Sequence, residues 1–128
     1  VRLLVDTHLL LRAVGEPHKL SPAARRLLDD GGNELWFSVV SLWEVAAKTA
    51  LGRADLRVDA RRLRRELLAN GWQELPISGE HAVATGDLPP THREQFDRML
   101  VAQSAAEGLT LVTMDPVVAR YPGRVRQV

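Results

Sequence analysis

Two apolar runs of β-strand character each lead into an acidic residue, and this feature constrains the fold more than any other. The run 3–5 leads into Asp6, and the run 109–113 leads through Met114 to Asp115. Continuous apolar runs are typical of strands buried on both faces of a parallel sheet. In an open α/β sheet, ligands bind at the carboxyl ends of the strands. We therefore expect Asp6 and Asp115 to lie at a functional edge.

Strand and helix patterns alternate along the chain. The patterns predict strands over about 2–6, 35–40, 72–77, 109–112 and 125–128, and helices over about 9–15, 22–30, 41–52, 59–70 and 96–107. Such alternation predicts an α/β fold with a mostly parallel central sheet. The 128 residues suffice for one domain with a buried core.

Composition excludes several classes of protein. No apolar run approaches the roughly 18 residues of a membrane span, and the N-terminal residues lack the features of a signal peptide. The chain has no cysteine, which excludes disulfides and thiolate metal sites, and its four histidines lack zinc spacing. These observations favour a cytoplasmic protein that does not contact a membrane.

Two more acids, Glu44 and Asp97, occur near the starts of helical patterns between the two strands. Acids at strand ends and helix starts are expected at the same rim of the sheet, so Asp6 and Asp115 would join them there. Carboxylate oxygens are the ligands that Mg²⁺ and Mn²⁺ prefer. Crowded carboxylates repel one another, and a bound cation usually compensates that repulsion. The joint pattern predicts a hard-metal site.

Each acid also fits a structural role. The Ser41-x-x-Glu44 pattern fits a capping box, and Asp115-Pro116 is typical of a helix N-cap followed by proline. The other two acids also stand at predicted helix starts, where a carboxylate meets free backbone amides. Glu44 is spaced to pair with Lys48 one helical turn further on. For any one acid, capping and metal binding are equally good interpretations.

Hydroxyl side chains flank the first and fourth acids. Thr7 and Thr113 are candidates for hydrogen bonds that support the carboxylates or a metal-bound water. A turn hydroxyl for Thr7 and simple β-propensity for Thr113 are the alternatives. His8 follows Asp6 closely, and either lines the site or has a structural role.

Four motifs in order resemble those of the PIN-domain nucleases, specifically the VapC toxins of bacterial toxin–antitoxin pairs. The motifs are residues 4–10, 41–48, 92–103 and 111–115, so the resemblance runs nearly end to end. The family's third motif usually has an acid and a proline before the Phe, whereas this chain has Glu94-Gln95 before Phe96. The missing proline leaves Asp97 in place.

The resemblance implies a PIN-like three-layer α/β/α sandwich over residues 1–128 and a Mg²⁺-dependent endoribonuclease, with Mn²⁺ as a substitute ion. Asp6 and Asp97 would hold the ion most directly, and Asp115 would add a ligand. Glu44 would complete the acidic pocket and orient the attacking water. The resemblance further implies a VapB-type antitoxin, an RNA substrate and a homodimer, alone or in a larger complex with the antitoxin.

Basic residues gather in two stretches of the chain. They are Arg53, Arg57, Arg61, Arg62, Arg64 and Arg65, and then Arg120, Arg124 and Arg126. A basic patch beside an acidic centre suits a polyanion such as RNA. A solvated, arginine-rich helix face is an equally good interpretation. His92, in the loop before Asp97, either contacts RNA or makes a loop hydrogen bond.

Two functions of other classes remain as alternatives. A receiver-type phosphoacceptor domain needs an acidic pair after the first strand and a lysine after the last main strand. This chain has Asp6-Thr7 and no such lysine. A non-catalytic binding module of the same fold would not need all four acids. A phosphodiesterase assay with and without Mg²⁺ separates the three.

Overall fold

The central sheet is fully parallel in the computed structural model, which describes residues 1–52, 58–90 and 94–128. Its strands are β1 (Arg2–Val5), β2 (Glu34–Ser38), β3 (Gln73–Leu75), β4 (Thr110–Thr113) and β5 (Val125–Gln127). They lie in the order β3-β2-β1-β4-β5, and each neighbouring pair is parallel. All five predicted strands are confirmed, with shifts of one or two residues at their ends.

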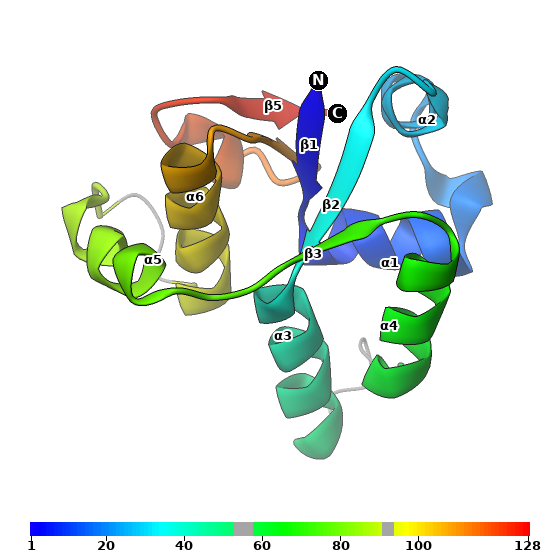
Figure 1. Ribbon diagram of the computed structural model, residues 1–128, viewed down its shortest axis with the longest axis horizontal. Helices are drawn as coiled ribbons and strands as arrows, with labels where there is room; N and C mark the ends of the chain where they lie inside the picture. The colour runs from blue at the N-terminus through cyan, green and yellow to red at the C-terminus, as the bar shows by residue number, and fades with distance from the viewer. Residues whose placement is uncertain (53–57, 91–93) are drawn as a thin grey trace.

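Helices cover both faces of the sheet. They are α1 (Thr7–Gly15), α2 (Pro22–Asp29), α3 (Val39–Ala50), α4 (Ala60–Ala69), α5 (Gly79–Ala84) and α6 (Gln95–Glu107), with 3-10 turns at Pro17–Lys19, Thr85–Asp87 and Val118–Arg120. Helices α1, α2 and α4 lie on one side of the sheet, and α5 and α6 lie on the other (Figure 1). The predicted three-layer α/β/α sandwich is confirmed. No helix in the described parts of the chain has the length and apolar character that a membrane crossing needs.

Alternate residues of β1 contribute to two separate cores. Leu3 and Val5 pack in the core that contains Leu9 of α1, whereas Leu4 packs in the core that contains Leu100 of α6. Both faces of the strand are therefore removed from water. This explains why residues 3–5 are apolar without a break, since a strand covered on both faces has no side that favours polar residues.

Local capping signals set several helix ends as predicted. Ser21 caps α2 by accepting the backbone N–H of Ala24, and Pro22 occupies the first helical position. Gly108 ends α6 with φ +67°, a left-handed conformation that glycine adopts without strain.

The predicted start of α3 is wrong. Strand β2 ends at Ser38, whose Oγ accepts the backbone N–H of Val40, so the helix begins at Val39 rather than at Ser41. Ser41 lies inside the helix, where it is buried and accepts a hydrogen bond from Thr7 Oγ1 at 2.9 Å. The capping-box interpretation of Ser41 and Glu44 is therefore excluded.

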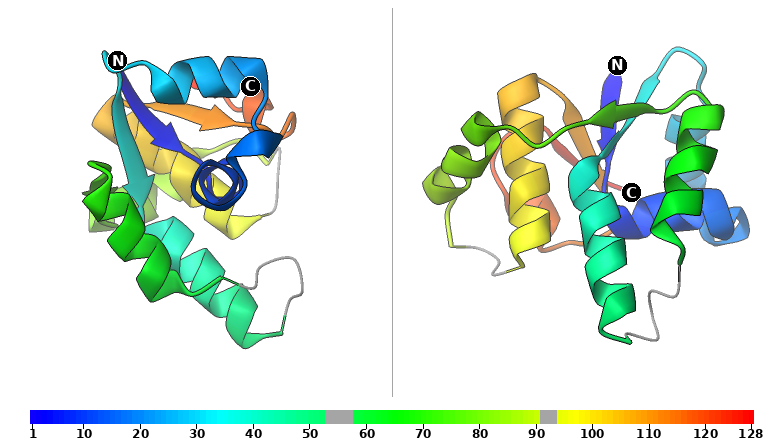
Figure 2. Two further views of the ribbon diagram at one scale, coloured as in Figure 1. Left: turned by 90° about the vertical axis from the view of Figure 1, so that its right-hand side faces the viewer. Right: turned by 60° about the horizontal axis from the view of Figure 1, so that its bottom comes forward.

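The order of strands reverses direction between β1 and β4. From β1 the chain adds β2 and β3 on one side, and β4 and β5 extend the sheet on the other. Ligands bind at such a switch point, outside the carboxyl ends of the strands. Asp6 directly follows β1, and Asp115 comes two residues after β4. Helices α3 and α4 extend as an antiparallel pair beyond this part of the sheet (Figure 2).

Candidate active site at the carboxyl edge of the sheet

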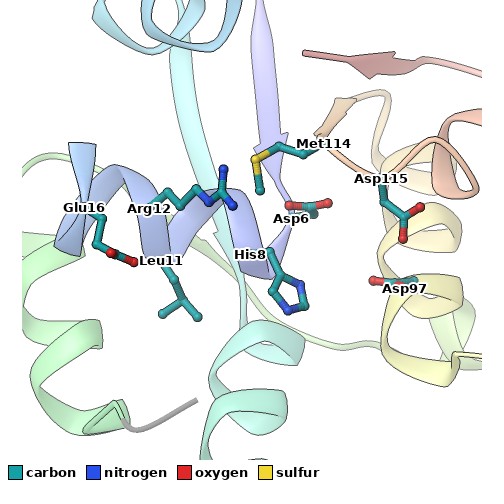
Figure 3. Close-up of a pocket in the computed structure, with 8 residues that line it drawn as sticks. All are labelled: Asp6, His8, Leu11, Arg12, Glu16, Asp97, Met114 and Asp115. Carbon is teal, nitrogen blue, oxygen red and sulfur yellow. The ribbon is translucent and has the colours of Figure 1, made fainter. Parts of the chain in front are cut away.

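A pocket of about 390 Å³ lies at the switch point. Its lining residues are Asp6, His8, Leu11, Arg12, Glu16, Asp97, Met114 and Asp115. Figure 3 shows the three aspartates coming from different elements: the end of β1, the first turn of α6 and the loop after β4. Three of the four predicted acids thus meet in one pocket although they are far apart in the chain.

Asp6 is held through both oxygens of its carboxylate. Oδ1 accepts the backbone N–H of Leu9 at 3.0 Å, which makes Asp6 the N-cap of α1, and Oδ2 accepts the hydroxyl of Thr113. Burial raises the pKa of Asp6 to about 6, and the charge of Asp97 also raises it. The hydrogen bonds from Thr113 and Leu9, and then the charge of His8, act in the opposite direction. A bound cation would relieve this cost of ionisation.

Thr113 connects two of the pocket acids. Its Oγ1 donates to Asp6 and accepts the backbone N–H of Asp115 at 3.0 Å. Asp115 Oδ1 in turn accepts the N–H of Val117 at 2.8 Å, in keeping with the capping geometry that the sequence indicates. Thr113 therefore occupies the supporting position predicted for it. Thr7 makes a different contact, because its hydroxyl donates to Ser41 of α3.

Asp97 lies in the first turn of α6. The N-cap of that helix is Glu94, whose Oε1 accepts the N–H of Phe96 at 2.9 Å. Gln95 therefore occupies the first helical position, where proline is favourable but not required. The departure from the family's third motif leaves the helix start, and with it Asp97, in place.

Glu44 lies outside the lining of this pocket. It is in the middle of α3 rather than at its start, and it is 1% exposed. Its Oε2 pairs with Lys48 Nζ at 2.6 Å, which confirms the predicted pairing one turn apart. Oε1 is buried and has no hydrogen-bond partner among the described residues. Lys48 Nζ also lies 4.0 Å from Oε2 of Glu94, so these residues form a separate cluster between α3 and α6.

The chemistry of the pocket fits a hard divalent cation. In the described ranges, no three His, Asp or Glu side chains stand close enough together to form a ready-made metal cage. Mg²⁺ does not require such a cage, because it is usually held by one or two carboxylates together with water and substrate phosphate. Three aspartates around one pocket, one of them with a pKa raised by burial, supply those oxygens.

Sequence reasoning missed the contribution of α1 to the pocket beyond His8. Leu11, Arg12 and Glu16 line it together with His8. Residues three or four positions apart share one face of a helix, so this spacing was the available signal. His8 itself is exposed, in agreement with the lining role. His92, Arg53 and Arg57 lie outside the described residues.

The fold and the pocket define a class: three-layer α/β/α proteins with carboxylates at the switch point of a parallel sheet. A family model, the PIN domain, matches residues 3–124 of this chain. The chain belongs to the PIN domain family. A search of the curated proteins finds no match to the sequence.

Solved structures support the same fold. A structure described as VapBC2 from Rickettsia felis bound to a promoter DNA fragment has a TM-score of 0.70 at 15% identity, covering 100% of this chain and 98% of the other. A toxin–antitoxin complex from Klebsiella pneumoniae has a TM-score of 0.63 at 16% identity, covering 98% and 99%. VapBC-1 from nontypeable Haemophilus influenzae has a TM-score of 0.57 at 17% identity, covering 90% and 87%. The fold is thus shared over nearly the whole length of these chains.

Proposed function

We propose that this protein is a Mg²⁺-dependent endoribonuclease that cleaves RNA phosphodiester bonds at the acidic pocket, and that it is the toxin of a toxin–antitoxin pair. The observation that carries the proposal is the meeting of Asp6, Asp97 and Asp115 in one pocket at the switch point. Membership of the PIN domain family supports a nuclease. Its place of action would be the cytoplasm, where RNA is abundant.

The three pocket aspartates would hold the ion, Asp6 and Asp97 most directly and Asp115 as a further ligand. When bound, Mg²⁺ supplies charge stabilisation at the phosphate oxygens and lowers the pKa of a bound water. Thr113 keeps the Asp6 carboxylate oriented, and its bond to the Asp115 backbone couples the two ligands. Mn²⁺ would substitute, because it prefers the same oxygen ligands.

The role of orienting the attacking water, which the family resemblance implies for Glu44, is kept as a proposal although Glu44 lies outside the pocket lining. The support for this role is Oε1, a buried acceptor without a hydrogen-bond partner in the described residues. The other oxygen, Oε2, is held by Lys48. A carboxylate oxygen that has no other partner is a suitable acceptor for a water proton.

The partner would be a VapB-type antitoxin. The supporting observation is that similar solved structures, matched over nearly their full length, are described as VapBC or toxin–antitoxin complexes. The toxin would form a homodimer, alone or within a larger complex with the antitoxin.

Cleavage of single-stranded RNA by the purified protein tests the nuclease. We expect cleavage with Mg²⁺ or Mn²⁺, none in EDTA, and none for Asp97→Asn. Glu16→Gln is the matched control, since Glu16 lines the same pocket but pairs with Lys19 at 2.6 Å on an exposed surface. Full activity in EDTA would refute the mechanism.

Growth of a bacterial host tests the toxin. Expression of the protein alone should arrest growth, and co-expression of the antitoxin should restore it. Asp97→Asn expressed to the same soluble level should leave growth unaffected. Normal growth during strong expression of soluble wild-type protein would contradict this part of the proposal.

A further inference from the structure

We propose that Arg12 is a substrate-binding residue that holds the backbone phosphate next to the scissile one in a single-stranded RNA. This inference rests on the proposed nuclease function and adds a residue that contacts the substrate beyond the carboxylates. Its basis is the position of Arg12 in the pocket, the availability of its guanidinium and the charges around it.

The backbone of Arg12 lies further along α1 than the carboxylate end of the pocket, and its side chain reaches back toward Met114 and Asp6 (Figure 3). Asp6 caps the helix, and a rise of about 1.5 Å per residue places the Cα of Arg12 roughly 9 Å further along the axis. His8, Arg12 and Glu16 repeat at intervals of four and line the pocket from one helix face. Figure 3 shows the guanidinium of Arg12 on the pocket side of α1, beside Met114. The guanidinium therefore lies on the α1 side of the aspartates, where an extended strand that passes them would place a neighbouring phosphate.

The guanidinium of Arg12 is largely available. Its one hydrogen bond within the described residues runs from Nη1 to the carbonyl oxygen of Lys19 at 3.5 Å, the long limit for such a bond. Glu16 takes Lys19 as its ion-pair partner, and Lys19 rather than Arg12 is the main reason that the pKa of Glu16 is lowered.

Arg98 provides a contrast within the same protein. Its guanidinium donates to the carbonyl oxygens of Thr85 and Pro89 at 2.9 Å, to that of Leu88 at 3.3 Å and to the hydroxyl of Tyr121 at 3.2 Å. Those bonds hold two loops against α6, which is a structural task. Arg12 has no comparable set of acceptors in the described chain, so its donors can serve a ligand.

The charges around Arg12 point to an anion as that ligand. The acidic side chains of the pocket are Asp6, Glu16, Asp97 and Asp115, and Arg12 is the arginine among the lining residues. Within the described residues Arg12 makes its one hydrogen bond to Lys19 and forms no ion pair with Asp6, so the fold does not use it as the counter-ion of that carboxylate. The carboxylates of the pocket repel a polyanion that enters it. The positive charge of Arg12 offsets part of that repulsion next to the carboxylates. The planar guanidinium fork matches two phosphate oxygens.

Binding of a fluorescent octanucleotide RNA tests the proposal directly. The measurement is fluorescence anisotropy in an Asp97→Asn background, which prevents cleavage, at several salt concentrations. Removing one phosphate contact with Arg12→Met should reduce the salt slope of log affinity by about 0.7 and weaken binding about fivefold near 0.1 M salt. Arg12→Lys should regain most of the slope because it keeps the charge. Arg26→Met, on the exposed surface of α2, is the matched control and should bind as the parent does.

Substrate length provides the second test, in the otherwise wild-type protein. Arg12→Met should raise KM about fivefold on the octanucleotide, for the same single lost contact. The same substitution should raise KM less than twofold on a dinucleotide, because a dinucleotide has no flanking phosphate. Unchanged binding and salt slope, or equal losses on both substrates, would overturn the assignment. Absence of cleavage by the wild type would instead refute the nuclease proposal, and the anisotropy result would still decide whether Arg12 binds RNA.

Discussion

Two buried carboxylates of this protein, Asp6 and Glu44, are stabilised in opposite ways. Asp6 is 5% exposed and receives hydrogen bonds from Leu9 and Thr113, and within the described residues no lysine or arginine pairs with it. Glu44 is 1% exposed and forms an ion pair with Lys48 at 2.6 Å. The charge of Glu44 is thus balanced by the fold itself, whereas that of Asp6 is not.

This difference separates an internal ion pair from a site that requires a ligand. Hydrogen bonds lower the pKa of Asp6, but burial and the charge of Asp97 outweigh them, and the pKa stays near 6. Asp6 therefore gains most from an external cation. Glu44 already has a cation, the ammonium of Lys48, so it does not need a metal ion. Only its Oε1 has no hydrogen-bond partner among the described residues.

The largest expected effect is on metal binding and cleavage. Asp6→Asn should abolish measurable Mg²⁺ binding and slow RNA cleavage at least about a thousandfold, which is roughly 4 kcal/mol of barrier. Glu44→Gln should slow cleavage but keep Mg²⁺ affinity within about twofold, because Glu44 is not among the proposed ligands. Isothermal titration with Mg²⁺ measures the difference. Loss of Mg²⁺ affinity in both variants would break the comparison.

The next effect concerns the ion pair of Glu44. Lys48→Met leaves a buried carboxylate without its cation, so unfolding free energy should fall by about 3 kcal/mol in urea titrations at neutral pH. Adding Glu44→Gln should regain most of that loss, since the second change removes the uncompensated charge. Lys19→Met is the matched control, because the Lys19–Glu16 pair is half exposed on both sides and its loss should change the unfolding free energy far less than the loss of Lys48. Equal losses for the two lysines would contradict the internal role of Lys48.

A smaller effect is the pH dependence of stability. The pKa of Asp6 is about 6 in the folded protein against 3.8 as its ordinary value, so its stabilising contribution is full below pH 3.8 and is lost as pH rises through 6. Without metal, the wild type should lose about 2 kcal/mol between pH 4 and pH 8 relative to Asp6→Asn. Asparagine still caps the helix, so the variant should fold. Thermal melts check this, and Mg²⁺ at pH 8 should stabilise only the wild type. If the stabilities of the wild type and of Asp6→Asn changed with pH in the same way, ionisation of Asp6 would not destabilise the folded protein.

The smallest effect extends the comparison to the basic surface of α4. Arg64 pairs with Glu74 at 2.6 Å, whereas Arg61 and Arg65 are exposed and form no ion pair in the described part of the chain. Together these three side chains are expected to supply about one phosphate contact, so replacing Arg61, Arg62 and Arg65 by Ser should weaken RNA binding about fivefold and reduce its salt slope by about 0.7. Arg64→Ser is the control and should change RNA binding less. An unchanged salt slope in the triple variant would mean that these arginines only keep the helix surface solvated.

Much of the fold was predictable because its signals are local. A strand covered on both faces must be apolar throughout, so residues 3–5 indicated β1 without reference to the rest of the chain. Ser21 and Gly108 marked helix ends through their own backbone and side-chain geometry. The position of Asp97 in the first turn of α6 followed from the same kind of pattern.

The start of α3 was not predictable in this way. The sequence patterns place Ser38 inside a strand, but its side chain caps α3 and Val40 is buried in the core beside α6. Because the N-cap is Ser38, three residues before Ser41, Glu44 lies in the interior of α3 instead of in its first turn. Its pairing with Lys48 followed from spacing, but its separation from the pocket aspartates did not.

The sequence by itself determined that acids follow the two central strands and that a third stands at the start of α6. Only the tertiary structure decided which carboxylate has a cation, how deeply Asp6 is buried and which arginine remains available. The physical reason is that charge and burial depend on neighbours remote in the chain. Thr113, which holds Asp6, is 107 residues away from it in sequence, and the helices of both layers exclude water from the two cores.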